Sequence, residues 1–485
     1  MHNESLPYLL RLLLLGSVSV VLSACLSPPP EPALPPLPGV TPSQLFTAAP
    51  QDWPSAQWWK QWNNVDLNRL VSAAQAHNPD LDSAQARLEQ AAAVVSQAHG
   101  SLGANVSAMA SVDHERLSAN SYIPPPYGGK VYDDGELGLQ MQWDIDLWGQ
   151  RRALLKAAVG ERRARALELQ GMADWLSTQV AAAYVRYQFF LLQQQQVVQQ
   201  QTVEKAIVQR LQLRVQQGLE PAEHLQEPEL DQMASVQENQ DILGQLAQEQ
   251  VQLQTLTQLP WSALKLPPVA LPVIHSGIPP KIALDWVSRR ADLAAARARV
   301  EAATARVHAA HQAFYPDVNL AAMLGYSSLG LNKLVAGGSA VAGISPAIHL
   351  PLFDAGRLKA DMQQGESAAQ LAVADYQKTL AQAVTEVNRA LVGMASMQRQ
   401  QQVLQSRTQQ LQRQQQEVEQ RVIAGLDDPL PLLRLQQRLI LLHRQGLNLQ
   451  RQALLDQVAL VQALGGGFTD DTGLNTARSA IIHHD

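Results

Sequence analysis

The chain has 485 residues, of which 46% are apolar, and it carries 37 lysines and arginines against 43 aspartates and glutamates. That length fits two or three ordinary domains, and the scattered bases disfavour a nucleic-acid binder, which normally has a clustered basic face. A single Cys excludes a disulfide framework and a Cys-based zinc site. Aromatic residues make up only 5% of the chain, and long stretches consist of helix-forming Ala, Gln, Leu and Glu. This composition predicts extended helices rather than a large aromatic core.

Residues 1–24 are predicted to be a lipoprotein signal peptide. The apolar run from Leu9 to Leu22 is too short to cross a bilayer as a helix and suits a signal-peptide core. It ends in Leu22-Ser23-Ala24-Cys25, which resembles the bacterial lipobox, where Cys25 becomes the lipidated first residue of the mature protein. Leu26 replaces the Asp that usually signals inner-membrane retention, which favours the outer membrane. The alternative is a Cys that follows a signal peptide by chance.

A Pro-rich tether is expected next. Residues 27–40 read SPPPEPALPPLPGV, and Pro fixes φ and removes backbone donors, so this stretch is predicted to be extended. Residues 25–64 are therefore assigned to a lipid anchor and a tether that reaches the folded body.

The rest of the chain contains an internal duplication. Asn78–Glu89 and Arg290–Glu301 share Asp, Leu, Ala, Arg and Glu in register, and Arg214–Leu219 matches Arg421–Leu426. The offset of roughly 210 residues indicates duplication of one large unit. The predicted domains are a first repeat at 65–263, a Pro-rich linker at 264–280, a second repeat at 281–467 and a polar tail at 468–485.

Each repeat is predicted to read helix, strand, strand, long helix, turn, helix. The expected strands, at 102–112, 137–147, 318–326 and 342–352, alternate apolar and polar residues. Each covers the roughly ten residues of a tilted membrane-spanning strand. Alternation alone favours a soluble sheet with one face on a core. The lipoprotein signal and the hairpin loops rich in Gly, Pro and Ser favour the membrane instead.

The long helices are the second feature of each repeat. No Pro occurs between Gly149 and Glu220 or between Ala355 and Asp428, so each stretch allows a helix of about 70 residues, roughly 100 Å long. Shorter helices are expected at 65–100, 222–259, 281–313 and 430–464. Leu380, Val384, Val387, Leu391 and Met394 follow coiled-coil spacing. A filamentous coiled coil would explain this spacing but not the four strands.

A sheet of only four strands cannot close into a barrel inside a bilayer. Every backbone N–H and C=O there must be paired, and the smallest known barrels have about eight strands. The chain is therefore expected to pool its strands with further copies of itself.

Several motifs together point to one family. They are Trp58-Trp59-Lys60-Gln61-Trp62, Asn78-Pro79-Asp80-Leu81, Phe314-Tyr315-Pro316, Leu350–Arg357 and the two Arg-xxx-Gly-Leu turns. With these motifs the sequence resembles the TolC/OprM outer-membrane efflux family and, within it, the NodT-type lipoproteins. The resemblance implies a mixed α/β membrane protein: a homotrimer with a 12-stranded transmembrane β-barrel, four strands per chain, continued by a long periplasmic α-helical barrel.

The resemblance also implies a function. The protein would be the outer-membrane exit duct of a tripartite efflux pump, lipid-anchored in the outer membrane and extending into the periplasm. It would conduct drugs or other small toxic compounds passively, while a periplasmic adaptor protein and an inner-membrane transporter supply substrate and energy. Two alternatives stay open: the exit duct of a type I secretion system, and a lipid-anchored periplasmic coiled-coil scaffold that is not a pore.

The two helix turns are the candidate sites. The predicted adaptor contacts are Arg214, Gly218, Leu219, Arg421, Gly425 and Leu426. Gly permits the tight reversal, although each Gly alone also suits an ordinary helix C-terminus. The predicted periplasmic gate, where family members carry rings of charge, consists of Glu220, Glu223, Asp427, Asp428 and Arg434. The sequence departs from the family where acids are expected, because Pro431 and Arg434 follow Gly425 and His224 follows Gly218.

No catalytic, cofactor or metal site is predicted. His308 and His311 lie three residues apart on an expected helix, but no third ligand is evident. Gly465-Gly466-Gly467 follows a helix and precedes none, which excludes a phosphate-binding loop. We therefore expect a duct rather than an enzyme.

Overall fold

The computed structural model describes residues 55–120, 126–272 and 290–467. The predicted signal peptide, Cys25, the Pro-rich tether, part of the linker and the polar tail lie outside the described residues. Among the described helices, none combines the length and the apolarity that crossing a membrane requires.

The chain divides into two compact units, here called the sheet unit and the helical unit. The sheet unit includes Leu88–Arg165 and Ala296–Tyr376. The helical unit takes its described residues from Pro38–Arg87, Ala166–Ala295 and Gln377–Asp485. The long helices contribute residues to both units, because each unit boundary on them falls within a continuous helix.

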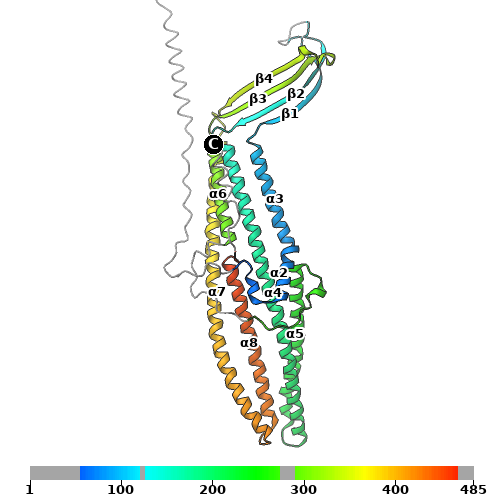
Figure 1. The fold of residues 1–485 in the computed structure, drawn as a ribbon, viewed down its shortest axis with the longest axis vertical. Helices are drawn as coiled ribbons and strands as arrows, with labels where there is room; N and C mark the ends of the chain where they lie inside the picture. Colours follow the sequence, from blue (N-terminus) through cyan, green and yellow to red (C-terminus); the bar gives the residue numbers. More distant parts are fainter. Residues whose placement is uncertain (1–54, 121–125, 273–289, 468–485) are drawn as a thin grey trace, which may run out of the picture. The chain divides into compact units, whose positions relative to one another are not determined.

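A single antiparallel sheet forms the distinctive part of the sheet unit (Figure 1). Its strands β1 (Asn105–Arg116), β2 (Val131–Ile145), β3 (Asp317–Leu329) and β4 (Ala340–His349) are hydrogen-bonded in the order β1-β2-β3-β4. The prediction of four strands is confirmed, with shifted ends. The fourth strand ends at His349, three residues before its predicted end.

The register gathers apolar side chains on one face of this sheet. Val106 lies opposite Met141, Met141 opposite Ala322, and Ala322 opposite Ile344. Val106, Leu139, Leu324 and Ile344 of this face are exposed in the isolated chain. A soluble sheet would bury such a face against a core. Its exposure favours contact with lipid or with another chain.

Seven α-helices are described. They are α2 (Val65–His77), α3 (Pro79–Gly100), α4 (Gln150–Gln216), α5 (Gln226–Thr257), α6 (Ala291–Gln312), α7 (Arg357–Ile423) and α8 (Pro429–Ala463). Short 3-10 turns occur at Trp58–Trp62, Ala222–Leu225, Trp261–Leu264, Leu331–Lys333 and Gly337–Ser339. Both α4 and α7 have 67 residues, so the two long helices match the length expected from the Pro-free stretches.

The prediction of a single helix at 65–100 is wrong, because the helix is interrupted at Asn78. A residue before Pro disfavours the α conformation, and Asn78 is extended with ψ of 123°. Pro79 then opens α3, where its missing N–H costs nothing. The Asn78 side chain accepts from the Asp80 N–H at 2.9 Å and donates to the Leu256 carbonyl at 3.0 Å. The Asn-Pro motif therefore forms the junction between α2 and α3, and the Asn78 side chain attaches this junction to α5.

Other predicted ends also move. The helix expected from Ala222 begins as α5 at Gln226, because Ala222–Leu225 is a 3-10 turn. α6 is described from Ala291, and residues 281–289 of its predicted helix are outside the described residues.

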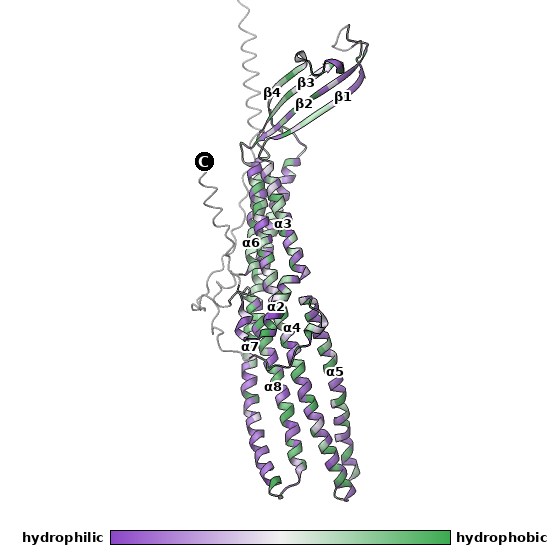
Figure 2. Ribbon diagram, turned by 45° about the vertical axis from the view of Figure 1, so that its right-hand side comes forward, coloured by the Kyte–Doolittle hydropathy of each residue, from purple (hydrophilic) through white to green (hydrophobic). Residues whose placement is uncertain are grey.

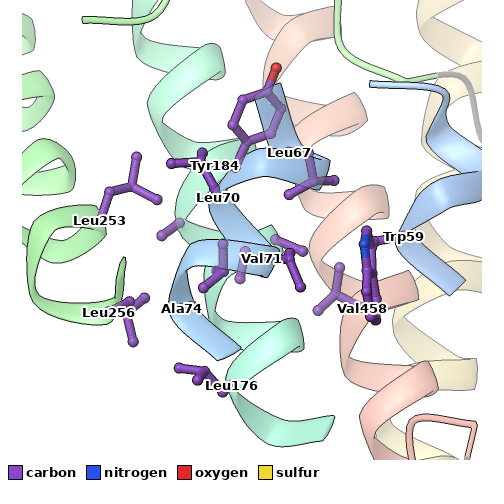
Figure 3. Packing of buried hydrophobic residues seen from close by; sticks show 14 of the residues in the cluster. Trp59, Leu67, Leu70, Val71, Ala74, Leu176, Tyr184, Leu253, Leu256 and Val458 are labelled. Carbon is purple, nitrogen blue, oxygen red and sulfur yellow. The ribbon is translucent and has the colours of Figure 1, made fainter. Parts of the chain in front are cut away.

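The core of the helical unit surrounds α2 (Figure 3). The buried side chains include Leu67, Leu70, Val71 and Ala74 of α2, Leu176 and Tyr184 of α4, Leu253 and Leu256 of α5, and Val458 of α8. The Trp-rich motif adds to this core: Trp58 packs edge-on against Trp59 and Trp62, with ring centroids 6.1 and 5.5 Å away. These contacts hold α4, α5 and α8 around a common point.

In the sheet unit, small residues let the helices approach closely. A Cβ added to Gly160 of α4 would lie 3.0 Å from the Cβ of Ala302 of α6, and one added to Gly365 of α7 would lie 3.7 Å from Val307. Most alanines of α6 are buried. Close packing of small side chains here replaces the large aromatic core that the composition excludes.

The junction at Asn78 gives a testable prediction. Asn78→Ala removes the α3 cap and leaves the buried Leu256 carbonyl without this donor, so we expect a loss of about 1–3 kcal/mol and a lower Tm. Thermal unfolding of the detergent-extracted protein, followed by circular dichroism, measures this. Gln90→Ala on the exposed face of α3 is the control and should change the Tm little. Equal Tm values for the two variants would contradict the role of Asn78.

Candidate functional site

Both helix turns have the same backbone geometry. Gly218 and Gly425 have φ of 70° and 71°, the left-handed region that favours Gly. The Leu219 N–H donates to the Arg214 carbonyl at 2.8 Å, and the Leu426 N–H donates to the Arg421 carbonyl at 2.9 Å. These bonds close the C-terminal ends of α4 and α7 in the pattern of a Schellman motif. The glycines therefore serve as helix terminators in both repeats.

The leucine after each Gly is exposed. Leu219 is 63% exposed and Leu426 is 74% exposed, although the residue after the Gly of such a turn often packs back on its helix. Each turn therefore presents one apolar side chain to its surroundings.

Asp428 joins α4 to the start of α8. One carboxylate oxygen caps α8 by accepting from the Leu430 N–H at 2.7 Å. The other accepts from Arg210 Nη2 at 2.8 Å and from Arg214 Nη1 at 3.3 Å. We call Arg210, Arg214 and Asp428 the clasp. Beside it, Ile207, Leu211 and Leu430 form a small buried cluster.

The remaining acids of the predicted gate are distributed between the two turns. Glu220 accepts from Arg214 at 3.1 Å and contacts His224 Nδ1 at 2.7 Å. Asp427 pairs with Arg421 at 3.0 Å. Glu223 is exposed on the 3-10 turn. The structure thus brings Arg214 together with Glu220 and Asp428, and Arg421 together with Asp427, so three of the four acids face arginines of the same chain.

Arg434 lies away from these pairs. It lines a cavity of about 270 Å³ between α4, α5 and α8, together with Glu204, Glu227 and Asp231. Arg210, by contrast, was missed in the sequence. Its signal was its position four residues before Arg214, which puts both side chains on one helix face.

The clasp lowers the pKa of its carboxylate. The hydrogen bond from Arg210 is the largest cause that lowers the pKa of Asp428, and the Leu430 N–H and Arg214 act in the same direction. The pKa of Glu220 is lowered chiefly by its hydrogen bonds to His224 and Arg214. Both groups are therefore charged at neutral pH, and the stability that they contribute is lost as pH falls through these lowered values.

A second polar layer lies further from the turns. Arg444 of α8 donates to Gln193 at 3.0 Å and Gln200 at 2.8 Å, both on α4, and to Glu238 of α5 at 3.0 Å. Sequence reasoning missed it, because Gln193 and Gln200 belong to a Gln-rich stretch that looks uniformly solvated. Like the clasp, this layer ties α8 to the α4–α5 hairpin.

The described residues hold no group of three His, Cys, Asp or Glu that could bind a metal ion. His308 and His311 both lie on α6, and His311 is 6.0 Å from the ring of Tyr315. The arrangement at the turns is one of ion pairs and exposed apolar side chains.

Residues 70–257 and 285–466 match the family model described as "Outer membrane efflux protein". The chain belongs to the outer membrane efflux protein family. The two matched segments include both turns and the clasp. The protein is accordingly an outer-membrane efflux protein.

Named relatives agree with this assignment. The chain is 29% identical over 439 residues to the putative multidrug resistance outer membrane protein MdtQ of Shigella flexneri, covering 87% of this chain and 90% of that protein. It is 27% identical to MdtP of Escherichia coli (strain K12), covering 96% and 98%. The structure of the outer membrane protein VceC from Vibrio cholerae is 31% identical, with a TM-score of 0.77, covering 86% of this chain and all of VceC.

A solved structure of lower identity extends the similarity in fold. The outer-membrane channel OprN is 22% identical, with a TM-score of 0.81, covering 90% of this chain and 99% of OprN. The arrangement of four strands and long helices is thus shared with a solved channel.

The double role of Asp428 gives a prediction with a built-in control. Asn caps a helix as well as Asp does, so Asp428→Asn removes the charge of the clasp and keeps the cap, whereas Asp428→Ala removes both. We expect Asp428→Ala to be less stable than Asp428→Asn by about 1 kcal/mol.

The two variants should also differ from wild type in a pH-dependent way. Because the pKa of Asp428 is lowered from 3.8, the wild type should exceed Asp428→Asn in Tm at neutral pH, and this difference should shrink as pH falls below that value. Thermal unfolding at a series of pH values measures both effects. A Tm difference that stays constant with pH would show that the clasp charge contributes nothing.

Proposed function

We propose that the protein acts as a homotrimeric exit duct of a tripartite pump, gated at its two helix turns. The observation that carries this proposal is the sheet, whose apolar face is exposed and whose edge strands β1 and β4 have no partner strand among the described residues. In hydrocarbon, unpaired N–H and C=O groups at such edges are too costly to remain open. Further copies of the chain are the natural source of partners for both edges.

The number of copies comes from the family resemblance. Three chains of four strands give a closed barrel of twelve, above the minimum of about eight. A scaffold that is not a pore has no use for a sheet with an exposed apolar face. The relatives are named multidrug resistance outer membrane proteins, which favours small toxic compounds over the secreted protein of a type I system. The cargo is therefore proposed to be drugs or similar compounds.

The clasp is proposed to hold the gate closed. It joins the end of α4 to the start of α8, so it ties the α4–α5 hairpin to the α7–α8 hairpin beside both turns. A hairpin cannot swing away from its neighbour while Arg210 and Arg214 hold Asp428. Opening requires these ion pairs to break or to be exchanged for contacts with a partner.

The exposed leucines are proposed to meet the periplasmic adaptor. Leu219 and Leu426 sit on equivalent turns and have no apolar cover of their own. Apolar side chains held rigidly at a helix end are effective docking points, because little entropy is lost when they are covered. The inner-membrane transporter would act through this adaptor. Lipidation of Cys25 would hold the chain to the outer membrane during assembly.

The adaptor contacts are tested by Leu219→Asp and Leu426→Asp. A charge on either turn should abolish docking, so drug tolerance of cells that depend on this duct should fall severalfold while trimers remain in detergent extracts. Val65→Asp is the control, since Val65 is also exposed but lies at the start of α2. Unchanged tolerance in both turn variants would remove the leucines from the adaptor surface.

The gate is tested by Arg210→Ala combined with Arg214→Ala. Without the clasp the closed state is less favoured, so single-channel conductance in planar bilayers should rise severalfold over wild type. Arg87→Ala, on the exposed face of α3, serves as the control and should conduct like wild type. Wild-type conductance in the double variant would mean that the clasp does not close the duct.

A further inference from the structure

The cavity between α4, α5 and α8 contains a buried carboxylate that lacks a counter-ion among the described residues. Figure 2 shows α8 beside the α4–α5 hairpin in this part of the helical unit. Glu204 of α4 lines the cavity, whose volume is about 270 Å³, and only 2% of this residue is exposed. Its Oε1 accepts from the Gln200 amide at 2.7 Å and from the Gln437 amide at 3.4 Å, whereas its Oε2 is buried without a hydrogen-bond partner.

The nearby Arg444 does not neutralise Glu204. Arg444 Nη1 donates to Gln200 Oε1 at 2.8 Å, and Gln200 donates to Glu204, so an amide separates the guanidinium from the carboxylate. The ion pair of Arg444 is formed with Glu238 instead. The charge of Glu204 is therefore left without a counter-charge, and such a charge is costly in a buried position.

The other charges of the cavity wall balance one another. Helix α5 supplies Glu227 and Asp231, helix α8 supplies Arg434 and Arg438, and all four residues are exposed. Two acids and two arginines sum to a charge of zero. The buried Glu204 thus gives the cavity one negative charge in excess, so a ligand with a single positive charge would neutralise it.

These features define the chemistry of a ligand that fits. The free oxygen of Glu204 needs a hydrogen-bond donor, and a protonated amine supplies donor and positive charge together. Ile207 and Pro228 of the same wall offer apolar contact to a short hydrocarbon chain. A metal ion fits less well, since the described part of the chain has no group of three His, Cys, Asp or Glu that could hold one. The cavity is slightly smaller than the roughly 300 Å³ of the smallest usual ligand pockets, so the ligand is small.

We propose that this cavity binds a small protonated primary amine, whose ammonium donates to Glu204 Oε2 and whose hydrocarbon chain lies against Ile207 and Pro228. The Gln437 amide turns aside to admit the ligand. This side chain also lines the cavity and is only half-buried. Its 3.4 Å contact with Glu204 is longer than a usual hydrogen bond, so little is lost when it breaks.

The amine site lies close to the clasp along α4. Glu204 precedes Arg210 by six residues, which is about 9 Å at 1.5 Å per residue. The site is built from the α4–α5 hairpin and α8, which the clasp also joins, so a bound amine would add a second connection between them. This consequence for the gate rests on the proposed function, whereas the binding of the amine does not.

Isothermal titration calorimetry of the detergent-extracted full chain tests the site. Butylammonium chloride, titrated at constant ionic strength and corrected for its heat with empty micelles, should bind saturably with one ligand per chain. Tetramethylammonium carries the same charge but has no N–H donor, so it should bind about tenfold more weakly. Equal affinity for the two cations, the absence of saturable binding, or displacement of butylammonium by an equal concentration of sodium would each overturn the proposal.

Two variants assign the binding to Glu204. Glu204→Gln keeps the size of the side chain and removes its charge, so it should weaken butylammonium binding about tenfold. Glu229→Gln is the matched control, because Glu229 is an exposed acid of α5 that does not line the cavity. Without ligand, Glu204→Gln should have the Tm of wild type or a higher one, since it removes a buried charge without a counter-ion. Unchanged affinity in Glu204→Gln would overturn the proposal, and so would a lower Tm, which would mean that the carboxylate already has a partner. Neither readout depends on efflux, so failure here is distinct from failure of the proposed function.

Discussion

The organisation of this protein depends on the cost of an unpaired peptide group in hydrocarbon. Among the described residues, four strands with an exposed apolar face leave the edges of β1 and β4 without a partner strand, and such edges are too costly to remain open in hydrocarbon. The same sheet takes two strands from each repeat, joined through the β2–β3 pairing. The two halves of the chain therefore each supply two strands, and the association of copies proposed above would supply the closure.

The helical unit is held by a different balance of forces. Around α2 and the tryptophans it has a large apolar core, whereas near the turns a smaller buried cluster lies beside ion pairs and amide hydrogen bonds. Polar links of this kind are individually modest and can be exchanged for others. A part of the molecule that must change shape is better joined by such links than by a packed core. The polar contacts along α4 and α8 near the turns therefore fit the gate proposed there, whereas the apolar contacts around α2 fit a region that keeps its shape.

Much of the fold could be predicted because its signals are local. Alternation in the strands, the absence of Pro from α4 and α7, and the repeated Arg-xxx-Gly-Leu turns each depend on neighbouring residues. The break at Asn78 has a local signal too, because a residue before Pro disfavours the α conformation, but the same Asn-Pro pair is also a motif of the family. Arg210 and Arg444 could not be found in this way. Their partners, Asp428 and Glu238, lie more than 200 residues away in sequence, and only the packing of α4, α5 and α8 brings them together.

The two turns share one backbone geometry but not one electrostatic environment. At the first, Glu220 is bound by Arg214 and His224, whereas at the second, Asp427 is bound by Arg421 alone. Around a threefold axis, three copies would present six Gly-Leu turns with nearly the same backbone geometry, and the two electrostatic environments would alternate among them. A partner that recognises only the shape of the turns would meet sixfold symmetry, whereas a partner that also recognises their charges would meet threefold symmetry. In the proposed trimer, identical adaptor subunits would therefore meet docking sites of two chemically different kinds.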